Sequence, residues 1–261
     1  MTKGYLVMAQ GNYLDMAIAL AESIKRTQTV VNNISIIVDQ VQPAHPAVDN
    51  FIVLKEDLAE TAKWKIQNRV FFYDLTPYDE TVILDADMLF LDDVSHWWEH
   101  MNKFEMLFTD KVKTYRNEWV TASPYRKTFV ANNIPNVYSA FTYFKKTETA
   151  SNVFDLVKLI ITNWEDFIDR YAPENRQDFA SIDLALGIAV KILGLEDQVF
   201  SPCDYPTFTH MKSGCQGWKD YSEDWSVHLG IYSTGNNIRL GNNLQSGILH
   251  YVDKNFLKAL K

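Results

Sequence analysis

The first half of the chain alternates short apolar runs with segments whose apolar residues recur at helical spacing. Strands of a parallel sheet read as near-continuous Val, Ile and Leu, so the runs predict strands and the periodic segments predict helices between them. The predicted strands are residues 5–9, 34–38, 51–54 and 81–84, and the predicted helices are residues 13–25 and 63–72. This alternation indicates an α/β sheet covered on both faces, in which ligands bind beyond the carboxyl ends of the strands.

The second half is less regular. Residues 137–144 predict a strand, and residues 150–164 and 181–193 predict helices, the latter ended by Gly194. From Ser201 onward Gly, Asn, Ser and aromatic residues dominate, which predicts loops and short strands. No internal repeat or linker divides the sequence, so we expect one continuous domain over residues 1–261.

Composition and charge narrow the classes of function. With 47% hydrophobic and 22% charged residues the chain has enough apolar material for a packed core, which argues against intrinsic disorder. A net charge of −8 without a Lys/Arg cluster argues against nucleic acid as a partner. Two cysteines fit a reducing compartment, and no apolar stretch approaches the roughly 20 residues of a membrane span. We therefore expect a cytoplasmic protein without an integral membrane segment.

Two carboxylates, Asp85 and Asp87, stand where the strand predicted at residues 81–84 leaves the sheet. Placing two carboxylates together is costly unless a cation lies between them or one is protonated. A hard divalent ion, which accepts carboxylate and phosphate oxygens, fits this pair best. The alternative is a solvated strand end whose carboxylates cap the following turn.

Two classes of enzyme use a hydrophobic strand followed by Asp-x-Asp. Haloacid-dehalogenase-like phosphatases carry it near the N-terminus, with Thr or Val two residues after the second Asp, where this chain has Leu89. Nucleotide-sugar glycosyltransferases of the type-A fold carry it after a run of alternating strands and helices. The position of Asp85-Ala86-Asp87 in the chain favours the second class.

Several separated motifs resemble glycosyltransferase family 8, which includes galactosyltransferases and glycogenin-like enzymes. Asp85-Ala86-Asp87 is similar to the family's Asp-x-Asp, whose carboxylates hold Mn²⁺ against the diphosphate of a UDP-sugar. The segment Ala9-Gln10-Gly11-Asn12-Tyr13 resembles the nucleotide-binding turn, with Gln10 where the family usually has an acid and Tyr13 placed to stack on the base. The resemblance implies a Rossmann-like domain with a mixed central sheet, whose residues 1–110 bind the nucleotide sugar and residues 111–261 the acceptor.

Basic and imidazole side chains complete the expected donor site. Arg69 is similar to the basic residue on the helix before the Asp-x-Asp strand, and Lys65 lies one turn earlier. Residues 247–254 resemble the family's closing His-x-x-Gly-x-x-Lys motif, which makes His250 the third metal ligand and Lys254 a charge for the departing diphosphate. The chain has Asp253 in place of the Gly, and its lysine comes two residues early. Alternatively, Arg69 is a solvated helix cation and His250 a core histidine.

A further acid lies at the start of the helix predicted over residues 181–193. Asp183 resembles the family's acid that faces the sugar and acceptor hydroxyls, although Asp178 competes for this role. Alternatively, Asp183 is an ordinary first-turn acid that stabilises the helix dipole. Tyr138 and Ala140 depart from the family's Asn-Ala-Gly segment, which leaves the donor sugar open.

The resemblance implies transfer of a hexose from a UDP-linked donor to an acceptor hydroxyl of a glycan or another molecule, with retention of anomeric configuration. In this interpretation Asp183 and Arg69 are the catalytic residues. Two alternatives stay open. One is a metal-dependent phosphatase or nucleotide-sugar hydrolase that uses the same Asp pair, and the other is a non-catalytic module that binds carbohydrate or nucleotide.

Overall fold

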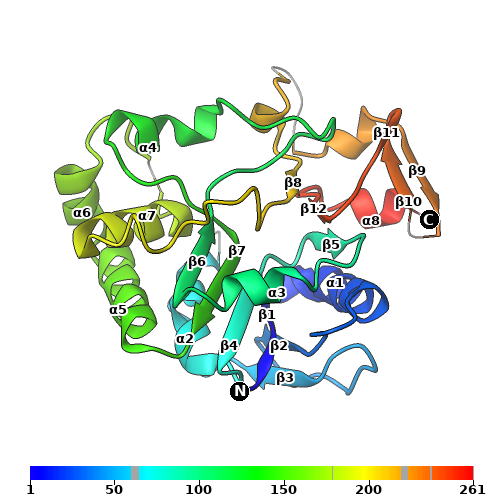
Figure 1. Ribbon diagram of the computed structural model, residues 1–261, viewed down its shortest axis with the longest axis horizontal. Helices are drawn as coiled ribbons and strands as arrows, with labels where there is room; N and C mark the ends of the chain where they lie inside the picture. Colours follow the sequence, from blue (N-terminus) through cyan, green and yellow to red (C-terminus); the bar gives the residue numbers. More distant parts are fainter. Residues whose placement is uncertain (60–64, 178, 219–222, 236, 261) are drawn as a thin grey trace.

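A six-stranded mixed sheet forms the centre of the computed structural model, which describes residues 1–59, 65–177, 179–218, 223–235 and 237–260 (Figure 1). The first four strands in the sheet order run parallel, and the fifth runs antiparallel to both of its neighbours. In sheet order the strands are β3 (Asn50–Val53), β2 (Ile34–Val38), β1 (Lys3–Ala9), β4 (Glu80–Leu84), β7 (Tyr138–Lys145) and β6 (Met106–Thr109).

The apolar runs of these strands are buried on both faces of the sheet. In β1, Tyr5 and Val7 face the layer that contains α1 (Leu14–Thr27), whereas Leu6 faces the layer that contains α5 (Glu148–Thr162) and α7 (Ile182–Leu193). Figure 1 shows α5 and α7 on the left of the sheet and α1 on its right. Two-sided burial explains why the strands read as continuous rather than alternating hydrophobic runs.

The four strands predicted in the first half are all present, and so is the strand predicted over residues 137–144. The helix predicted over residues 150–164 is wrong in one respect, because α5 ends at Thr162 and α6 (Trp164–Tyr171) begins after Asn163. Gly194 ends α7 in the left-handed conformation, with φ 64°, as the sequence predicts.

The helix predicted over residues 63–72 differs from the structure. Residues 63 and 64 lie outside the described residues, and Lys65–Phe71 form the 3-10 helix η2 rather than an α-helix. The α-helical conformation begins only with α2 (Phe72–Leu75). Because a 3-10 helix has three residues per turn, residues three apart share a face.

Two small sheets form from the later part of the chain. One pairs β5 (Met88–Phe90) with β12 (Ile248–His250) and β12 with β8 (Thr209–His210). The other contains β9 (Ile231–Thr234), β10 (Asn237–Leu240) and β11 (Asn243–Leu244). In Figure 1, β8 and β12 lie above the central sheet, on the side of the carboxyl ends of β1 and β4.

Short helical segments connect these elements. They are η1 (Gly11–Tyr13), α3 (Trp97–Met101), η3 (Pro124–Arg126), α4 (Lys127–Ala131), η4 (Ser213–Cys215), η5 (Trp225–Val227) and α8 (Phe256–Ala259). None of the helices within the described ranges is long and apolar enough to cross a membrane.

Candidate metal centre and adjoining pocket

The residues of the predicted metal site converge beyond the carboxyl end of β4. Asp85 follows that strand, and its backbone N–H donates to the carbonyl oxygen of Ala140 at 3.1 Å. The carbonyl of Asp87 accepts a hydrogen bond from the N–H of Tyr251 at 3.0 Å. The antiparallel pairing of β5 with β12 places His250 opposite Met88, directly beside Asp87. A small sheet built from distant segments therefore brings the three side chains together.

The distances in this cluster suit a divalent cation. Nε2 of His250 lies 3.1 Å from Oδ1 of Asp87 and 3.7 Å from Oδ2 of Asp85. One ligand atom from each residue lies within 4.8 Å of the other two. An ion with bonds of about 2.1 Å separates its neighbouring ligands by about 3 Å and its opposite ligands by about 4 Å. Two carboxylates and one imidazole thus form a possible site for a divalent cation.

The charged groups of this cluster shift one another's pKa. Burial alone would raise the pKa of the Asp87 carboxyl, but the charge and hydrogen bond of His250 outweigh it and hold that pKa below its usual range. Burial likewise opposes protonation of His250, yet Asp87 and then Asp85 raise its pKa. A proton on Nε2 therefore takes the position where a cation would bind, and metal binding has to displace it.

A second histidine, His210, which sequence reasoning missed, supports the first. Nδ1 of His210 lies 3.1 Å from Nδ1 of His250, and both side chains are buried. Burial, and then the positive charge of His250, hold the pKa of His210 well below its ordinary value, so this ring is neutral. A neutral His210 that accepts the Nδ1 proton of His250 leaves Nε2 of His250 directed at the carboxylates.

Arg69 lies beside the cluster, on η2. Its guanidinium forms an ion pair with the Asp85 carboxylate, and Nη1 lies 3.4 Å from Oγ of Ser139. Burial would lower the pKa of Arg69, but Asp85 and then Asp183 raise it. The side chain is therefore a fixed cation that orients Asp85, rather than a solvated helix cation.

Asp183 lies in the first turn of α7 and is connected to the cluster through Ser139. The backbone N–H of Ser139 donates to Oδ1 of Asp183 at 3.0 Å, and its hydroxyl donates to the same carboxylate. Nη2 of Arg126 donates to Oδ2 at 2.8 Å. Burial raises the pKa of Asp183, but Arg126 and the Ser139 hydrogen bonds outweigh it and lower that pKa below its ordinary value. Asp178 lies outside the described residues.

The predicted nucleotide-binding residues Ala9, Gln10, Asn12 and Tyr13 lie at the end of β1 and directly after it. Ala9 is the last residue of that strand and is buried. Gln10 is also buried, and its side-chain oxygen accepts a hydrogen bond from Asn68 at 2.8 Å. Asn12 is exposed in η1. The Gln10 side chain thus contributes to the packing of this turn against η2.

Tyr13 and Lys254, predicted separately from the two ends of the chain, lie together. The ammonium of Lys254 lies 5.0 Å from the centroid of the Tyr13 ring. The N–H of Gly11 donates to Oδ2 of Asp39 at 2.9 Å, which identifies a further acid at this edge that sequence reasoning missed. Lys65 begins η2, and its side chain lies outside the described residues.

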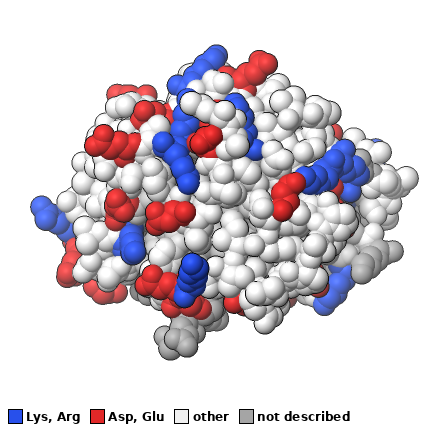
Figure 2. Space-filling model, turned by 90° about the horizontal axis from the view of Figure 1, so that it is seen from below, with Lys and Arg blue, Asp and Glu red and all other residues white. Residues whose placement is uncertain are grey.

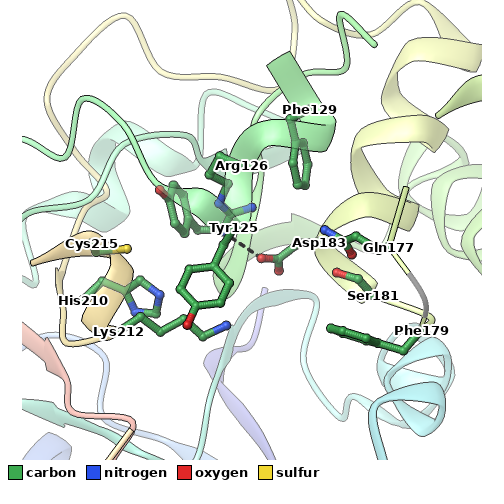
Figure 3. A pocket seen from close by; sticks show the side chains of 11 residues that line it. Tyr125, Arg126, Phe129, Gln177, Phe179, Ser181, Asp183, His210, Lys212 and Cys215 are labelled. Atoms are coloured by element: carbon green, nitrogen blue, oxygen red, sulfur yellow. Dashed lines mark hydrogen bonds and ion pairs between the residues drawn. The ribbon is translucent and has the colours of Figure 1, made fainter. Parts of the chain in front are cut away.

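A pocket opens next to Asp183 (Figure 3) and encloses about 430 Å³, part of it open to solvent. Tyr125 and Lys212 lie on one side of it, and Phe179 and Ser181 on the other. The ion pair of Arg126 with Asp183 lies between these sides, and His210 also lines the pocket. The pocket therefore adjoins the group formed by Asp85, Asp87 and His250. His210 lines the pocket and contacts His250, and Asp183 lines the pocket and contacts Ser139, which lies beside Arg69.

The surface carries charges of both signs. On the face drawn in Figure 2, Lys and Arg side chains occur singly or in small groups among Asp and Glu. The prediction that nucleic acid is not a partner is compatible with this face and stays a prediction.

No protein-family model and no curated protein matches the sequence. Among solved structures, mouse xyloside xylosyltransferase 1 has a TM-score of 0.50 at 10% identity, over 78% of this chain and 86% of that chain. The glycosyltransferase GlyE of Streptococcus pneumoniae TIGR4 has a TM-score of 0.45 at 15% identity, over 77% of this chain and 46% of its own. The bifunctional glycosyltransferase WbbM has a TM-score of 0.48 at 16% identity, over 77% of this chain and 39% of its own.

The chain thus spans less than half the length of GlyE and WbbM. At these identities the likeness concerns the fold alone. It confirms the predicted fold class, an α/β type-A glycosyltransferase fold with a mixed central sheet. Membership of family 8 stays a prediction.

Proposed function

We propose that the protein is a metal-dependent glycosyltransferase that moves a hexose from a nucleoside-diphosphate sugar to an acceptor hydroxyl. The proposed donor is a UDP-hexose. The observation that carries this proposal is the convergence of Asp85, Asp87 and His250 at the carboxyl end of β4 in a glycosyltransferase fold. Ligands of open α/β sheets bind at this edge. The three side chains hold Mn²⁺ or Mg²⁺ in the proposed complex.

The chemical difficulty is the leaving group. In the net transfer, the bond between the anomeric carbon and the diphosphate oxygen breaks with its electron pair on the diphosphate, a bond forms between that carbon and the acceptor oxygen, and the acceptor's proton passes to a diphosphate oxygen or to water. A divalent cation at the cluster supplies Lewis-acid stabilisation of the diphosphate charge. Arg69 fixes one ligand carboxylate, and His210 fixes the ring of His250. These contacts keep the ligand geometry in place before the donor arrives.

We assign the donor base to the edge formed by η1. Tyr13 offers an aromatic face, and Lys254 places a positive charge over it. Asn12 adds an exposed amide within the same turn. A cation held beside an aromatic ring suits a nucleotide, whose base stacks and whose phosphate carries negative charge.

We assign the sugar and the acceptor hydroxyl to the pocket beside Asp183. Arg126 and Ser139 hold this carboxylate ionised and in one orientation. In the proposed complex Asp183 positions the reacting hydroxyls by accepting their hydrogen bonds. Retention of anomeric configuration follows from the family resemblance and forms part of the proposal.

Incubation with a panel of UDP-hexoses and Mn²⁺, with and without glycan acceptors, tests the proposed function. We expect metal-dependent release of UDP and transfer of the hexose to an acceptor. Asp87→Asn should lower turnover by at least about 100-fold, because the ligand set loses a charge. Asp155→Asn, on the exposed face of α5, is the matched control and should keep wild-type turnover.

The same incubation separates the alternatives. Release of inorganic phosphate identifies a phosphatase, and UDP release without transfer to any acceptor identifies a nucleotide-sugar hydrolase. Binding of UDP without turnover of any donor identifies a non-catalytic module. Each of these results contradicts the proposed transfer reaction.

A further inference from the structure

Among the described residues that line the pocket beside Asp183, basic side chains outnumber acidic ones. These are two cations, Arg126 and Lys212, and one carboxylate, Asp183. In a protein of net charge −8, an excess of cations in a concave site indicates an anionic ligand.

The two cations differ in what they already bind. Arg126 donates from Nη2 to Asp183 and from Nη1 to the carbonyl of Val137, at 2.8 and 2.7 Å. Lys212 forms no ion pair with any residue that the structure describes, and its ammonium lies 4.6 Å from the centroid of the Tyr125 ring. The charge of Lys212 contributes to the lowered pKa of Asp183, but its ammonium is in no ion pair within the described residues and can bind an anionic group, whereas the guanidinium of Arg126 already binds Asp183.

Aromatic surface lies next to this charge. Phe179 is 58% exposed and Tyr125 is 41% exposed, although both line the pocket. Figure 3 shows the two rings on opposite sides of the pocket, with Lys212 beside Tyr125. A sugar ring has apolar faces that pack against aromatic rings, and burying such exposed rings is favourable.

Two residues that line the pocket also have buried polar atoms without a hydrogen-bond partner among the described residues. Nε of Arg126 and Oε1 of Gln177 are buried and have no hydrogen-bond partner within the described part of the chain. Both residues line the pocket. Buried donors and acceptors without partners are costly, so a ligand with hydroxyl groups that reach them gains affinity.

One further acid lies close by and limits the excess charge. Burial, and next the charge of Glu223, raise the pKa of Tyr125, so this carboxylate lies near that ring. Glu223 does not line the pocket and is exposed. Its charge is therefore screened by water more strongly than that of Lys212, which is half-buried.

We infer that the pocket takes an acceptor sugar that carries one negative charge, as a carboxylate or a phosphate. The sugar ring lies between Tyr125 and Phe179, the anionic group lies against Lys212, and a hydroxyl reaches Asp183. This inference rests on the proposed function, because Asp183 and its contact with Ser139 direct that hydroxyl toward the metal cluster. It adds a charge preference that the transfer reaction alone does not require.

Binding of matched sugars tests this inference. The probes are methyl glucoside, methyl glucuronide and methyl glucoside 6-phosphate, with the three galactose counterparts, titrated calorimetrically into protein that contains Mn²⁺ and UDP. We expect at least one anionic sugar to bind at least about ten-fold more tightly than its neutral counterpart. A hydrogen bond to a charged group typically contributes a gain in affinity of this size. The uronide and the phosphate distinguish the two sources of charge.

Two variants locate the preference. Lys212→Met keeps the apolar stem and removes the charge, so it should abolish the ten-fold preference while neutral sugars bind as before. Lys103→Met, at an exposed position outside the pocket, is the control and should retain the preference. The same preference in Lys212→Met, or no preference in the wild-type protein, overturns the inference.

Two further results separate this inference from the proposed function. Mn²⁺-dependent UDP binding with no charge preference among sugars overturns only the charged acceptor. A charge preference without Mn²⁺-dependent UDP binding overturns the transfer reaction and leaves an anionic-sugar site. If UDP-glucuronic acid binds more tightly than UDP-glucose while free sugars show no preference, the charge belongs to the donor and the acceptor assignment is wrong.

Discussion

The contact between His210 and His250 determines which ring nitrogen of His250 faces Asp85 and Asp87. Since both Nδ1 atoms lie 3.1 Å apart, one ring donates and the other accepts. Metal coordination through Nε2 requires the proton of His250 on Nδ1, and the neutral His210 ring accepts it there. His210 is therefore a positioning residue that acts through His250.

Replacement of His210 tests this role. His210→Phe keeps an aromatic ring but accepts no hydrogen bond, so Mn²⁺ affinity should fall about 10- to 100-fold, as for other residues that support a metal ligand. His210→Gln offers a side-chain oxygen to the same proton and should restore most of the affinity. Calorimetric titration with Mn²⁺ measures both. Equal affinities in the Phe and Gln variants would show that His210 contributes packing only.

Asp183 links protonation to folding stability. Its pKa in the folded protein lies below the ordinary value of 3.8, so its ionised form stabilises the fold. That stabilisation is complete above the ordinary value and disappears as the pH falls through the folded-state pKa. Between pH 5 and pH 3, urea unfolding in a chelator should show a steeper loss of stability in the wild-type protein than in Asp183→Asn. Parallel pH profiles of the two proteins would contradict the assigned ion pair.

Some site residues can be predicted from the sequence and others cannot. Asp85 and Asp87 are adjacent to a strand that the hydrophobic pattern predicts, so their position at the sheet edge follows directly. His210 carries no local signal, because its role depends on the pairing of β8 with β12, 40 residues away along the chain. Ser139 and Asp39 were missed for the same reason, since their partners lie in other segments.

At the scale of elements, the bounds of long periodic segments were predictable, whereas for the region after Ser201 the sequence predicts only that its strands are short. The strands of the parallel part of the sheet and the helices α1 and α7 follow from hydrophobic spacing. The strands β5, β8 and β12 have two or three residues each, too few for a period, and they exist because they pair with one another. This small sheet places His250 beside Asp87, so the geometry of the candidate metal site does not follow from the hydrophobic pattern.

Gly187 in α7 provides a test of how closely this helix packs. A Cβ atom there would lie 2.7 Å from Cγ2 of Ile134 and 2.8 Å from the carbonyl oxygen of Pro135. Helix propensity favours Ala over Gly by about 1 kcal/mol, whereas overpacking costs about 1–3 kcal/mol. We expect Gly187→Ala to lower the free energy of unfolding by about 1 kcal/mol in denaturant titrations.

The control for this substitution is Ile192→Ala, at an exposed position of the same helix. A surface change there should alter the free energy of unfolding by no more than about 0.5 kcal/mol. A more stable Gly187→Ala protein would show that the segment at residues 134–135 yields and that α7 is not fixed by this contact.

At the scale of the whole molecule, the candidate site joins the two ends of the sequence. Asp85 and Tyr13 come from the first 110 residues, and His250 and Lys254 from the last 12. The division into a donor-binding half, residues 1–110, and an acceptor-binding half, residues 111–261, stays a prediction. The residues that line the pocket all lie in the second half. The protein has a net charge of −8, so the proposed binding of a diphosphate depends on a metal ion and basic side chains that make the site locally positive.

We propose that Asp85, Asp87 and His250 hold a divalent cation that binds the diphosphate of a nucleotide sugar. The most direct measurement is calorimetric titration of UDP into the wild-type protein and Asp87→Ala, each with Mn²⁺ and with a chelator. We expect Mn²⁺ to strengthen UDP binding by at least about ten-fold in the wild-type protein and to leave UDP binding unchanged in Asp87→Ala. Equal UDP affinity in all four titrations would contradict it.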